Sequence, residues 1–249
     1  MTPTVLLLGG TTEAMQMGQA LAAQGVRATI SLAGRVKTPA AQPLPVRIGG
    51  FGGVDGLVHH LTAQGVTHVI DATHPFAAQM SANAVAACDA LDTPLLALTR
   101  APWQAEAEDR WTHVPDIAGA VAALSGRSRR VFLALGRMIL PAFAAQPQHD
   151  YLLRLVDAPD RVPLPKAQVV TDRGPFDLEG DLALMRAHGT ELVVSKNAGG
   201  TGARAKIIAA RQLGLPVIMI DRPAIPVRKE AHSVEEALDW LHGATARGV

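Results

Sequence analysis

The residues best able to do chemistry form a glycine-rich, cationic stretch in the second half of the chain, opening out of the apolar run 192–195. Its glycine, polar and cationic positions are Ser195, Lys196, Asn197, Gly199, Gly200, Arg204 and Lys206. Backbone amides exposed by glycines, together with three cations, suit carboxylates or phosphates. The Gly-Lys-Ser/Thr of a P-loop is missing, so the stretch predicts an anion-binding turn of another kind.

Two further arginines follow apolar runs in this half of the chain. They occur as Gly136-Arg137 and as Asp221-Arg222-Pro223. Each arginine alone is typical of a protein surface. Together with the glycine-rich stretch, Arg137 and Arg222 favour a site for an anionic ligand.

A second turn with chemical capacity follows the first apolar run of the chain. Its residues are Gly9, Gly10, Thr11, Thr12 and Glu13. Between a strand and a helix, such a turn lets backbone amides and the helix N-terminus face a pyrophosphate. The full Gly-x-Gly-x-x-Gly pattern is absent, and a helix cap formed by Thr11 or Thr12 is the alternative. Its position after the first strand favours nucleotide binding.

The next strand-like run ends in a basic loop that contains Ser31, Gly34, Arg35 and Lys37. NAD sites usually place an acid here for the ribose 2′-hydroxyl, whereas NADP sites place an arginine nearby. There is no acid between Ile30 and Gly53. A solvated basic loop is the alternative, but the pattern favours NADPH as the cofactor.

Two more loops follow strand-like runs in the first half. Glycines 49, 50, 52 and 53 surround Phe51, and Gly50 and Gly52 allow close backbone approach to a cofactor. A flexible turn is the alternative there. The other loop begins Asp71-Ala72-Thr73-His74. Ligands of open α/β sheets bind beyond the carboxyl ends of strands, so we expect Asp71, Ala72 and Thr73 at the cofactor. His74 is a candidate proton donor, although a lone histidine is more often structural.

Short apolar runs alternate with alanine-rich helical segments, which is the pattern of βαβ units and parallel sheets buried on both faces. The expected strands are 5–8, 27–32, 46–48, 68–72, 94–99, 131–135, 151–156, 168–171, 192–195 and 217–220. The expected helices are 13–24, 55–64, 77–91, 116–124, 178–188, 203–213 and 234–241.

The alternation breaks at 100–111, where the charged stretch 106–110 is the best candidate for a boundary. We therefore expect an α/β protein of two doubly wound, Rossmann-like parallel-sheet domains with a cleft between them. The first would span 1–105 and bind NADPH, and the second would span 106–249. A single fused sheet is the alternative, and a strand or the last helix could cross between domains.

Composition excludes several classes of protein. The 249 residues carry 23 Lys and Arg against 22 Asp and Glu, which predicts neither a nucleic-acid nor a membrane partner. Cys88 is the only cysteine, so we expect no disulfide and no cysteine metal site. No apolar run approaches the ~20 residues of a membrane span, and the start of the chain lacks the pattern of a signal peptide. A cytoplasmic enzyme is expected.

Several enzyme motifs are missing as well. Tyr151 is the only tyrosine and lacks the Tyr-x-x-x-Lys pattern of short-chain dehydrogenases. There is no Gly-x-Ser-x-Gly nucleophile elbow and no His-Glu-x-x-His zinc helix. We expect neither a metal nor an activated nucleophile.

In combination, these motifs resemble the precorrin-6A reductase family over nearly the whole chain. No single motif is decisive, but eight occur in the family's order. The matching residues are Gly9 to Glu13, Ser31 to Arg35, Gly49 to Gly53, Asp71 to Ala77, Arg100 with Pro102 and Trp103, Gly136-Arg137, Ser195 to Gly200 with Lys206, and Asp221-Arg222-Pro223.

The resemblance implies two Rossmann-like domains and reduction of one double bond of precorrin-6A by NADPH, giving precorrin-6B in cobalamin biosynthesis. The anionic ligand would then be a tetrapyrrole with many acetate and propionate groups. The resemblance places Arg100 among the substrate contacts, and His74 and Lys196 are the candidate proton donors. A related branch reduces the cobalt-containing ring and stays an alternative. So do an NADPH reductase of another anionic small molecule and a non-catalytic NADPH sensor. The oligomeric state stays open, a monomer included.

Overall fold

The structure is a computed structural model of the chain, and it describes residues 2–34, 40–157, 161–174 and 176–246. The chain divides into two compact units. The first combines Met1–Ala101 with Ala224–Val249, and the second is Pro102–Pro223. Each unit is an α/β body with its own parallel sheet and core. The expected α/β class with two parallel-sheet bodies is therefore confirmed.

The first unit contains six parallel strands in the order β12-β5-β4-β1-β2-β3. The strands are β1 (Thr4–Leu8), β2 (Arg27–Leu32), β3 (Val46–Ile48), β4 (His68–Asp71), β5 (Leu95–Leu98) and β12 (Lys229–Ala231). The helices are α1 (Thr12–Ala23), α2 (Gly53–Ala63), α3 (Ala78–Leu91) and α7 (Val234–Ala246). Read from β3, this is the 3-2-1-4-5-6 order of dinucleotide-binding folds, whose ligands bind where the order reverses, between β1 and β4.

The second unit has the same spatial order of strands, but its sixth strand, β6, comes first along the chain. Its sheet runs β6-β11-β10-β7-β8-β9, all parallel. The strands are β6 (Arg110–Val114), β7 (Arg130–Ala134), β8 (Asp150–Leu155), β9 (Ala167–Thr171), β10 (Leu192–Lys196) and β11 (Pro216–Ile220). The helices are α4 (Ile117–Ala123), the 3₁₀ segment η1 (Arg137–Ala145), α5 (Leu178–His188) and α6 (Ala205–Gln212). Here β7 and β10 take the places of β1 and β4, so the reversal lies between them.

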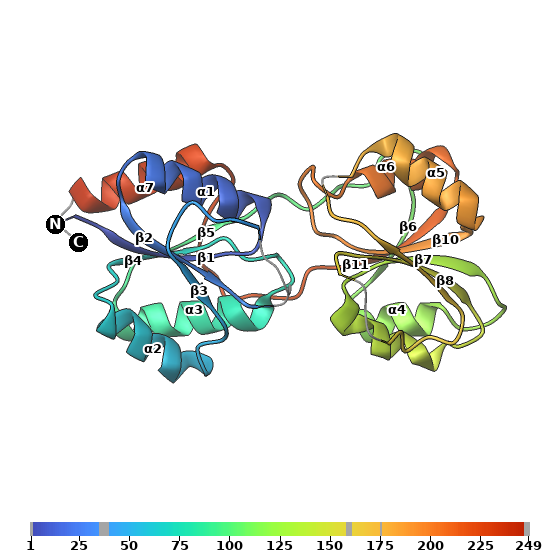
Figure 1. Cartoon of the computed structure of the whole chain (residues 1–249), viewed down its shortest axis with the longest axis horizontal. Helices are drawn as coiled ribbons and strands as arrows, with labels where there is room; N and C mark the ends of the chain where they lie inside the picture. The colour runs from blue at the N-terminus through green and yellow to red at the C-terminus, as the bar shows by residue number, and fades with distance from the viewer. Residues whose placement is uncertain (1, 35–39, 158–160, 175, 247–249) are drawn as a thin grey trace. The chain divides into compact units, whose positions relative to one another are not determined.

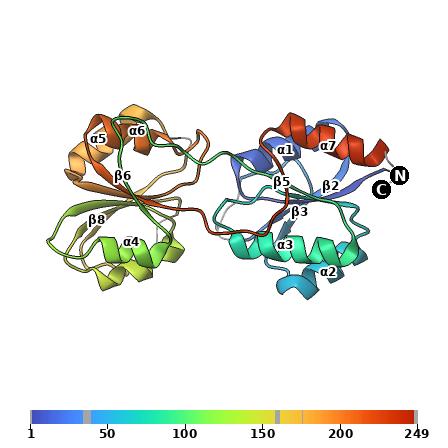
Figure 2. The same cartoon turned by 180° about the vertical axis from the view of Figure 1, so that it is seen from behind.

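Each sheet is covered by helices on both faces, which explains why its central strands are continuous apolar runs. In the first unit α1 and α7 cover one face, and α2 and α3 cover the other (Figure 1). In the second unit α5 and α6 lie on one face and α4 on the opposite one (Figure 2). No helix in the described ranges is long and apolar enough to cross a membrane.

Two edge strands, β6 and β12, were not expected from the sequence. Both are the sixth strand of their sheet in the dinucleotide-binding order. In β6 only Val114 is buried, and in β12 only Ala231 is. Because an edge strand is covered on fewer sides, its residues need not form an apolar run. The continuous apolar runs that predict the other strands are therefore missing from β6 and β12.

The division also differs from the expected boundary between 105 and 106. Residues 224–249 belong to the first unit. The sequence places them in the second half, with a strand or the last helix as the part that could cross. The reason is pairing and packing: β12 pairs with β5, and α7 contributes Ala237 and Leu241 to the core beside α1.

Candidate functional site

The turn after β1 lies at the reversal point of the first sheet. The backbone N–H of Gly9 donates to the carbonyl of Ser31, and that of Ala72 donates to the carbonyl of Leu8, each at 2.9 Å. These bonds join the carboxyl ends of β1, β2 and β4. A Cβ at Gly9 would lie 2.8 Å from side-chain carbons of Ile30, so any other residue there would require the Ile30 side chain to shift. Gly10 has φ +115°, and a Cβ on it would meet no atom within 4 Å, so the space beside it is open.

Thr11 connects this turn to the end of β4. Its Oγ1 accepts a hydrogen bond from the backbone N–H of Ala14 at 3.1 Å and thereby caps α1. The same hydroxyl donates to the carbonyl of Ala72 at 2.8 Å. Thr12 and Glu13 begin the helix, and the first N–H groups of a helix have no partner within it. The turn therefore has the open, donor-rich form that a pyrophosphate requires.

Glu13 and Arg100, expected as a cofactor contact and a substrate contact, are partners of each other. Arg100 Nη1 donates to Glu13 Oε2 at 2.6 Å, and both side chains are largely buried. Burial acts to raise the pKa of Glu13, but the hydrogen bond and charge of Arg100 lower it below its ordinary value. A carboxylate in the first turn of α1 would repel an anion, and Arg100 offsets that charge.

Asp71 is the centre of a buried hydrogen-bond network at the end of β4. Its Oδ1 accepts from the backbone N–H of Thr73 at 3.1 Å and from Thr73 Oγ1 at 2.7 Å. Its Oδ2 accepts from Ser81 Oγ at 2.6 Å and from Arg228 Nη1 at 2.7 Å. Both carboxylate oxygens are thus engaged by the protein. Asp71 is suited to shape the turn that carries Thr73 and His74, and a direct contact with a cofactor stays a prediction.

His74 lies in the turn between β4 and α3, at the carboxyl edge of the sheet. Its Nδ1 accepts a hydrogen bond from the backbone N–H of Phe76 at 3.2 Å. An accepting Nδ1 carries no proton, so the neutral ring holds its proton on Nε2. This contact fixes both the tautomer and the direction of the ring.

The carboxyl ends of β2 and β3 hold a cation that the sequence had not singled out. Arg47 is opposite Ser31 in the strand pairing and donates to Ser31 Oγ at 3.3 Å. It also donates to the carbonyls of Gly49 and Gly50. Gly34 has φ +72° just after β2. Arg35 and Lys37, expected to surround a 2′-phosphate, lie outside the described residues.

The reversal point of the second sheet carries two of the expected cations. Ser195 of β10 is opposite Ala134 of β7. Lys196 ends β10, while Gly136 and Arg137 follow β7 after Leu135, so both cations come from the carboxyl edge of neighbouring strands. Ser195 itself is fully buried, and its Oγ donates to the carbonyl of Lys196 at 3.2 Å. This edge has the position and charge for an anionic ligand.

The remaining members of the glycine-rich stretch hold the stretch itself in place. Asn197 is buried: its Oδ1 accepts from the backbone N–H of Trp103 at 2.7 Å, and its Nδ2 donates to the Trp103 carbonyl at 3.0 Å. Arg222 donates to the carbonyls of Asn197 and Ala198 at 3.0 and 3.1 Å. Trp103 Nε1 donates to the Gly200 carbonyl at 2.7 Å.

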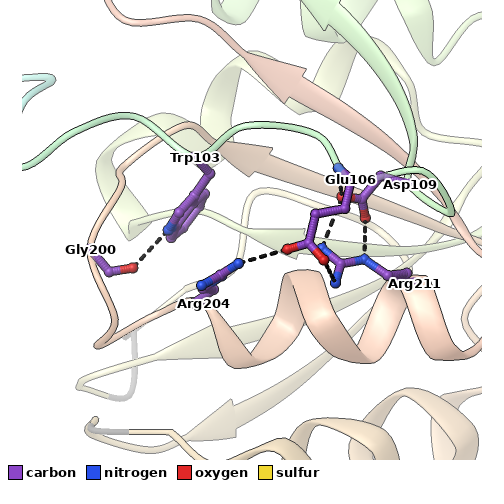
Figure 3. Close-up of polar contacts among 6 residues, drawn as sticks. All are labelled: Trp103, Glu106, Asp109, Gly200, Arg204 and Arg211. Carbon is purple, nitrogen blue, oxygen red and sulfur yellow. Dashed lines mark hydrogen bonds and ion pairs between the residues drawn. The ribbon is translucent and has the colours of Figure 1, made fainter.

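Arg204 and Lys206 also have internal partners. Arg204 forms an ion pair with Glu106 at 2.8 Å, and Arg211 pairs with Glu106 and Asp109 (Figure 3). Lys206 is 6% exposed, donates to the Ala203 carbonyl at 2.8 Å and lies over the Trp103 ring. The charged stretch after Trp103 therefore binds α6. Contact of Arg204, Lys206, Asn197, Gly199, Gly200 or Arg222 with a substrate stays a prediction.

The described residues contain no group of three or more His, Cys, Asp or Glu side chains that could hold a metal ion. The first unit instead presents the open glycine turn, the capped helix and the strand order of a dinucleotide site. These features fit a nicotinamide dinucleotide, with Gly10 and the first turn of α1 at the pyrophosphate.

Comparison with known proteins identifies the family. The model of the family described as precorrin-6x reductase CbiJ/CobK matches residues 4–242. The chain belongs to this family. As a precorrin-6x reductase family member it is an oxidoreductase, and the motif resemblance found in the sequence is confirmed.

Relatives match the reductase over almost its full length. The precorrin-6A reductase of Rhodobacter capsulatus is 61% identical over 98% of this chain and 99% of its own. That of Sinorhizobium sp is 44% identical over 96% and 94%. A cobalt-precorrin-6A reductase of Priestia megaterium is 30% identical over 97% and 99%. A solved structure named CobK precorrin-6A reductase gives a TM-score of 0.93 at 60% identity, covering 97% of this chain and 96% of that one.

Sequence reasoning missed three residues that organise the candidate site of this reductase, namely Arg47, Ser81 and Arg228. Arg47 could have been noticed as a cation inside a short apolar strand that precedes a glycine cluster. Ser81 and Arg228 gave no such signal, because each acts by contacting Asp71 from a separate part of the chain.

Replacing Asn197 by alanine should destabilise the second unit of the reductase. The substitution leaves the N–H and carbonyl of buried Trp103 without their partners, which costs about 2 kcal/mol. Urea unfolding followed by tryptophan fluorescence measures the loss. Gln104→Ala, at an exposed neighbouring position, is the control and should change the free energy of unfolding by less than about 0.5 kcal/mol. Equal stability of the two variants would contradict the anchoring role of Asn197.

Proposed function

We propose that this reductase uses NADPH to reduce one double bond of precorrin-6A, giving precorrin-6B in cobalamin biosynthesis. The observation that carries the proposal is the Gly9–Thr11 turn at the reversal point of a sheet with dinucleotide-binding order. The 61% identity to a precorrin-6A reductase over nearly the whole chain supports the substrate.

In the first unit, the chain's own residues bind and orient the cofactor. Gly10 and the N–H groups at the start of α1 receive the pyrophosphate, while Arg100 offsets the charge of Glu13. Residues 14–54 contain no acid, which favours a 2′-phosphate over a free 2′-hydroxyl near Ser31. Arg35 as a phosphate contact stays a prediction. When bound, NADPH supplies the hydride, and the protein supplies positioning and exclusion of water.

In the second unit, Arg137 and Lys196 bind carboxylates of the macrocycle at the carboxyl edge of β7 and β10. The loop after β10 is held in place beside this edge by hydrogen bonds of Arg222, Asn197 and Trp103. Because the acetate and propionate groups are spread around the ring, we expect no single cation to dominate affinity.

The metal-free ring is the preferred substrate in this proposal. The relatives named precorrin-6A reductase are 61% and 44% identical to the chain, whereas the cobalt-precorrin-6A reductase of Priestia megaterium is 30% identical. A cytoplasmic location stays a prediction, and so does any oligomeric state.

The test is incubation of the purified full-length chain with NADPH and precorrin-6A while the absorbance of both is followed. One NADPH should be oxidised for each precorrin-6A reduced, and NADH should support a much slower reaction at equal concentration. Oxidation only with the cobalt-containing ring would favour the related branch. Stoichiometric NADPH binding without turnover of either ring would favour a sensor and contradict the proposed activity.

A further inference from the structure

The guanidinium of Arg47 is held in one orientation at the carboxyl edge of the first sheet. Nη1 donates to the Gly49 carbonyl at 2.5 Å and to Ser31 Oγ at 3.3 Å, and Nη2 donates to the Gly50 carbonyl at 2.7 Å. Its plane lies over the Phe51 ring, with Cζ 3.8 Å from the ring centroid. The side chain therefore turns from the middle of β3 toward the edge where ligands of such sheets bind.

The loop that Arg47 holds packs against α2. A Cβ at Gly56, in the first turn of α2, would lie 1.8 Å from the Phe51 carbonyl oxygen, so loop and helix are in direct contact. The Phe51 ring also lies 5.1 Å, centroid to centroid, from the ring of His60 on α2. Arg47 is thus fixed by the loop, by an aromatic face and by β2.

The positive charge of Arg47 is not offset by any carboxylate among the described residues: its partners there are two carbonyls and one hydroxyl. By contrast, the partly buried Arg100, Arg211 and Arg228 each pair with an acid. Burial lowers the pKa of His60, and the charge of Arg47 lowers it further. His60 is therefore mainly neutral at pH 7, and among the residues that the structure describes Arg47 is the cation held between β2 and β3 at this edge.

We infer that Arg47, together with the Ser31 hydroxyl, binds the 2′-phosphate of NADPH and sets the preference over NADH. This inference rests on the proposed function, because it requires NADPH as the cofactor. A guanidinium has five N–H groups, so donors remain for a phosphate beside those that hold the loop. The planar guanidinium of arginine can also donate two parallel hydrogen bonds to one phosphate, whereas the ammonium of lysine acts as a point charge.

The experiment measures binding of 2′,5′-ADP and 5′-AMP to the full-length chain by calorimetry, with no precorrin present. One charge-assisted hydrogen bond contributes about 1.5–3 kcal/mol. Arg47→Gln should therefore weaken 2′,5′-ADP by about 10- to 100-fold and 5′-AMP by less than threefold. Arg47→Lys should keep part of the preference for 2′,5′-ADP over 5′-AMP, since lysine keeps the positive charge but lacks the two-point donor geometry of the guanidinium. Arg27→Gln removes a charge from the exposed, opposite end of β2 and should leave both affinities unchanged.

The outcomes separate this inference from the cofactor proposal. If the wild type discriminates between the two nucleotides and Arg47→Gln does so equally well, the assignment of Arg47 is wrong while the NADPH preference stands. Equal weakening of both nucleotides would mean that Arg47 only holds the loop. If the wild type itself does not discriminate, the NADPH preference fails together with the role of Arg47. Should Arg47→Gln not fold, the Arg47→Lys variant takes its place in the test. The ratio of its affinities for 2′,5′-ADP and 5′-AMP, compared with that of the wild type, then decides the role of Arg47.

Discussion

Replacing His74 by alanine should slow the single-turnover reduction of precorrin-6A by about 100-fold or more, the typical contribution of general acid catalysis. A carbon beside the site of hydride addition must take up a proton. The Phe76 N–H occupies Nδ1 of His74 and leaves the proton of the neutral ring on Nε2, at the ligand edge of β4. We therefore expect His74 to give that proton from Nε2 in the imidazolium form, in which Nδ1 is protonated and the contact with the Phe76 N–H is released, so that donation leaves a neutral ring.

The measurement uses saturating NADPH and precorrin-6A, so that weakened binding does not enter the rate. Lys196→Ala is tested in parallel, since Lys196 is the other candidate donor. His59→Ala, at an exposed position on α2, is the histidine control and should react at the wild-type rate. A fall of less than about tenfold in both His74→Ala and Lys196→Ala would remove both as proton donors. The proton would then come from a held water or from a carboxyl group of the substrate.

Breaking the buried pair of Asp71 and Arg228 should cost more stability than any other single change considered for the first unit. Their side chains are 1% and 8% exposed. Asp71→Leu leaves the buried Arg228 guanidinium with only the half-exposed Glu230, 3.8 Å from its Nε, and removes the acceptor for Thr73 and Ser81. The expected loss is about 3–5 kcal/mol of the free energy of unfolding. Arg228→Met should cost a similar amount, because it leaves the carboxylate uncompensated.

A double-mutant cycle separates this explanation from simple overpacking. If the buried charge left without its partner causes the loss, Asp71→Leu combined with Arg228→Met should recover most of the stability of the single variants. The free energies of unfolding of the four proteins in urea give the interaction energy. Strictly additive losses would contradict the pair as the cause.

The parts of the fold that follow from local sequence were predicted well. Val5–Leu8 is apolar because it lies at the centre of a sheet covered on both faces, so its sequence alone indicates a strand. The same reasoning missed β6, in which Arg110, Thr112 and His113 are exposed at the sheet edge. Which segment pairs at the edge of a sheet depends on contacts with distant parts of the chain. The local sequence of that segment therefore does not indicate that it is a strand.

The candidate site shows the same limit. The Gly9–Thr11 turn was recognisable because its function requires glycine at a definite place after a strand. The partners of Asp71 were not, since Arg228 is 157 residues away along the chain. For Arg204 and Lys206 the sequence indicated charge correctly, but could not tell that Glu106 and the Ala203 carbonyl already bind these cations.

The return of residues 224–249 to the first unit has a consequence for biosynthesis. While the chain is being synthesised, the segment Pro102–Pro223 is made before Arg228, β12 and α7, which follow it directly along the chain. Domains usually fold in the order in which they leave the ribosome. In this protein the second unit can finish first, while the nascent first unit still exposes the open edge of β5 and the face that α7 will cover. That edge is a surface on which the unfinished chain needs protection from aggregation.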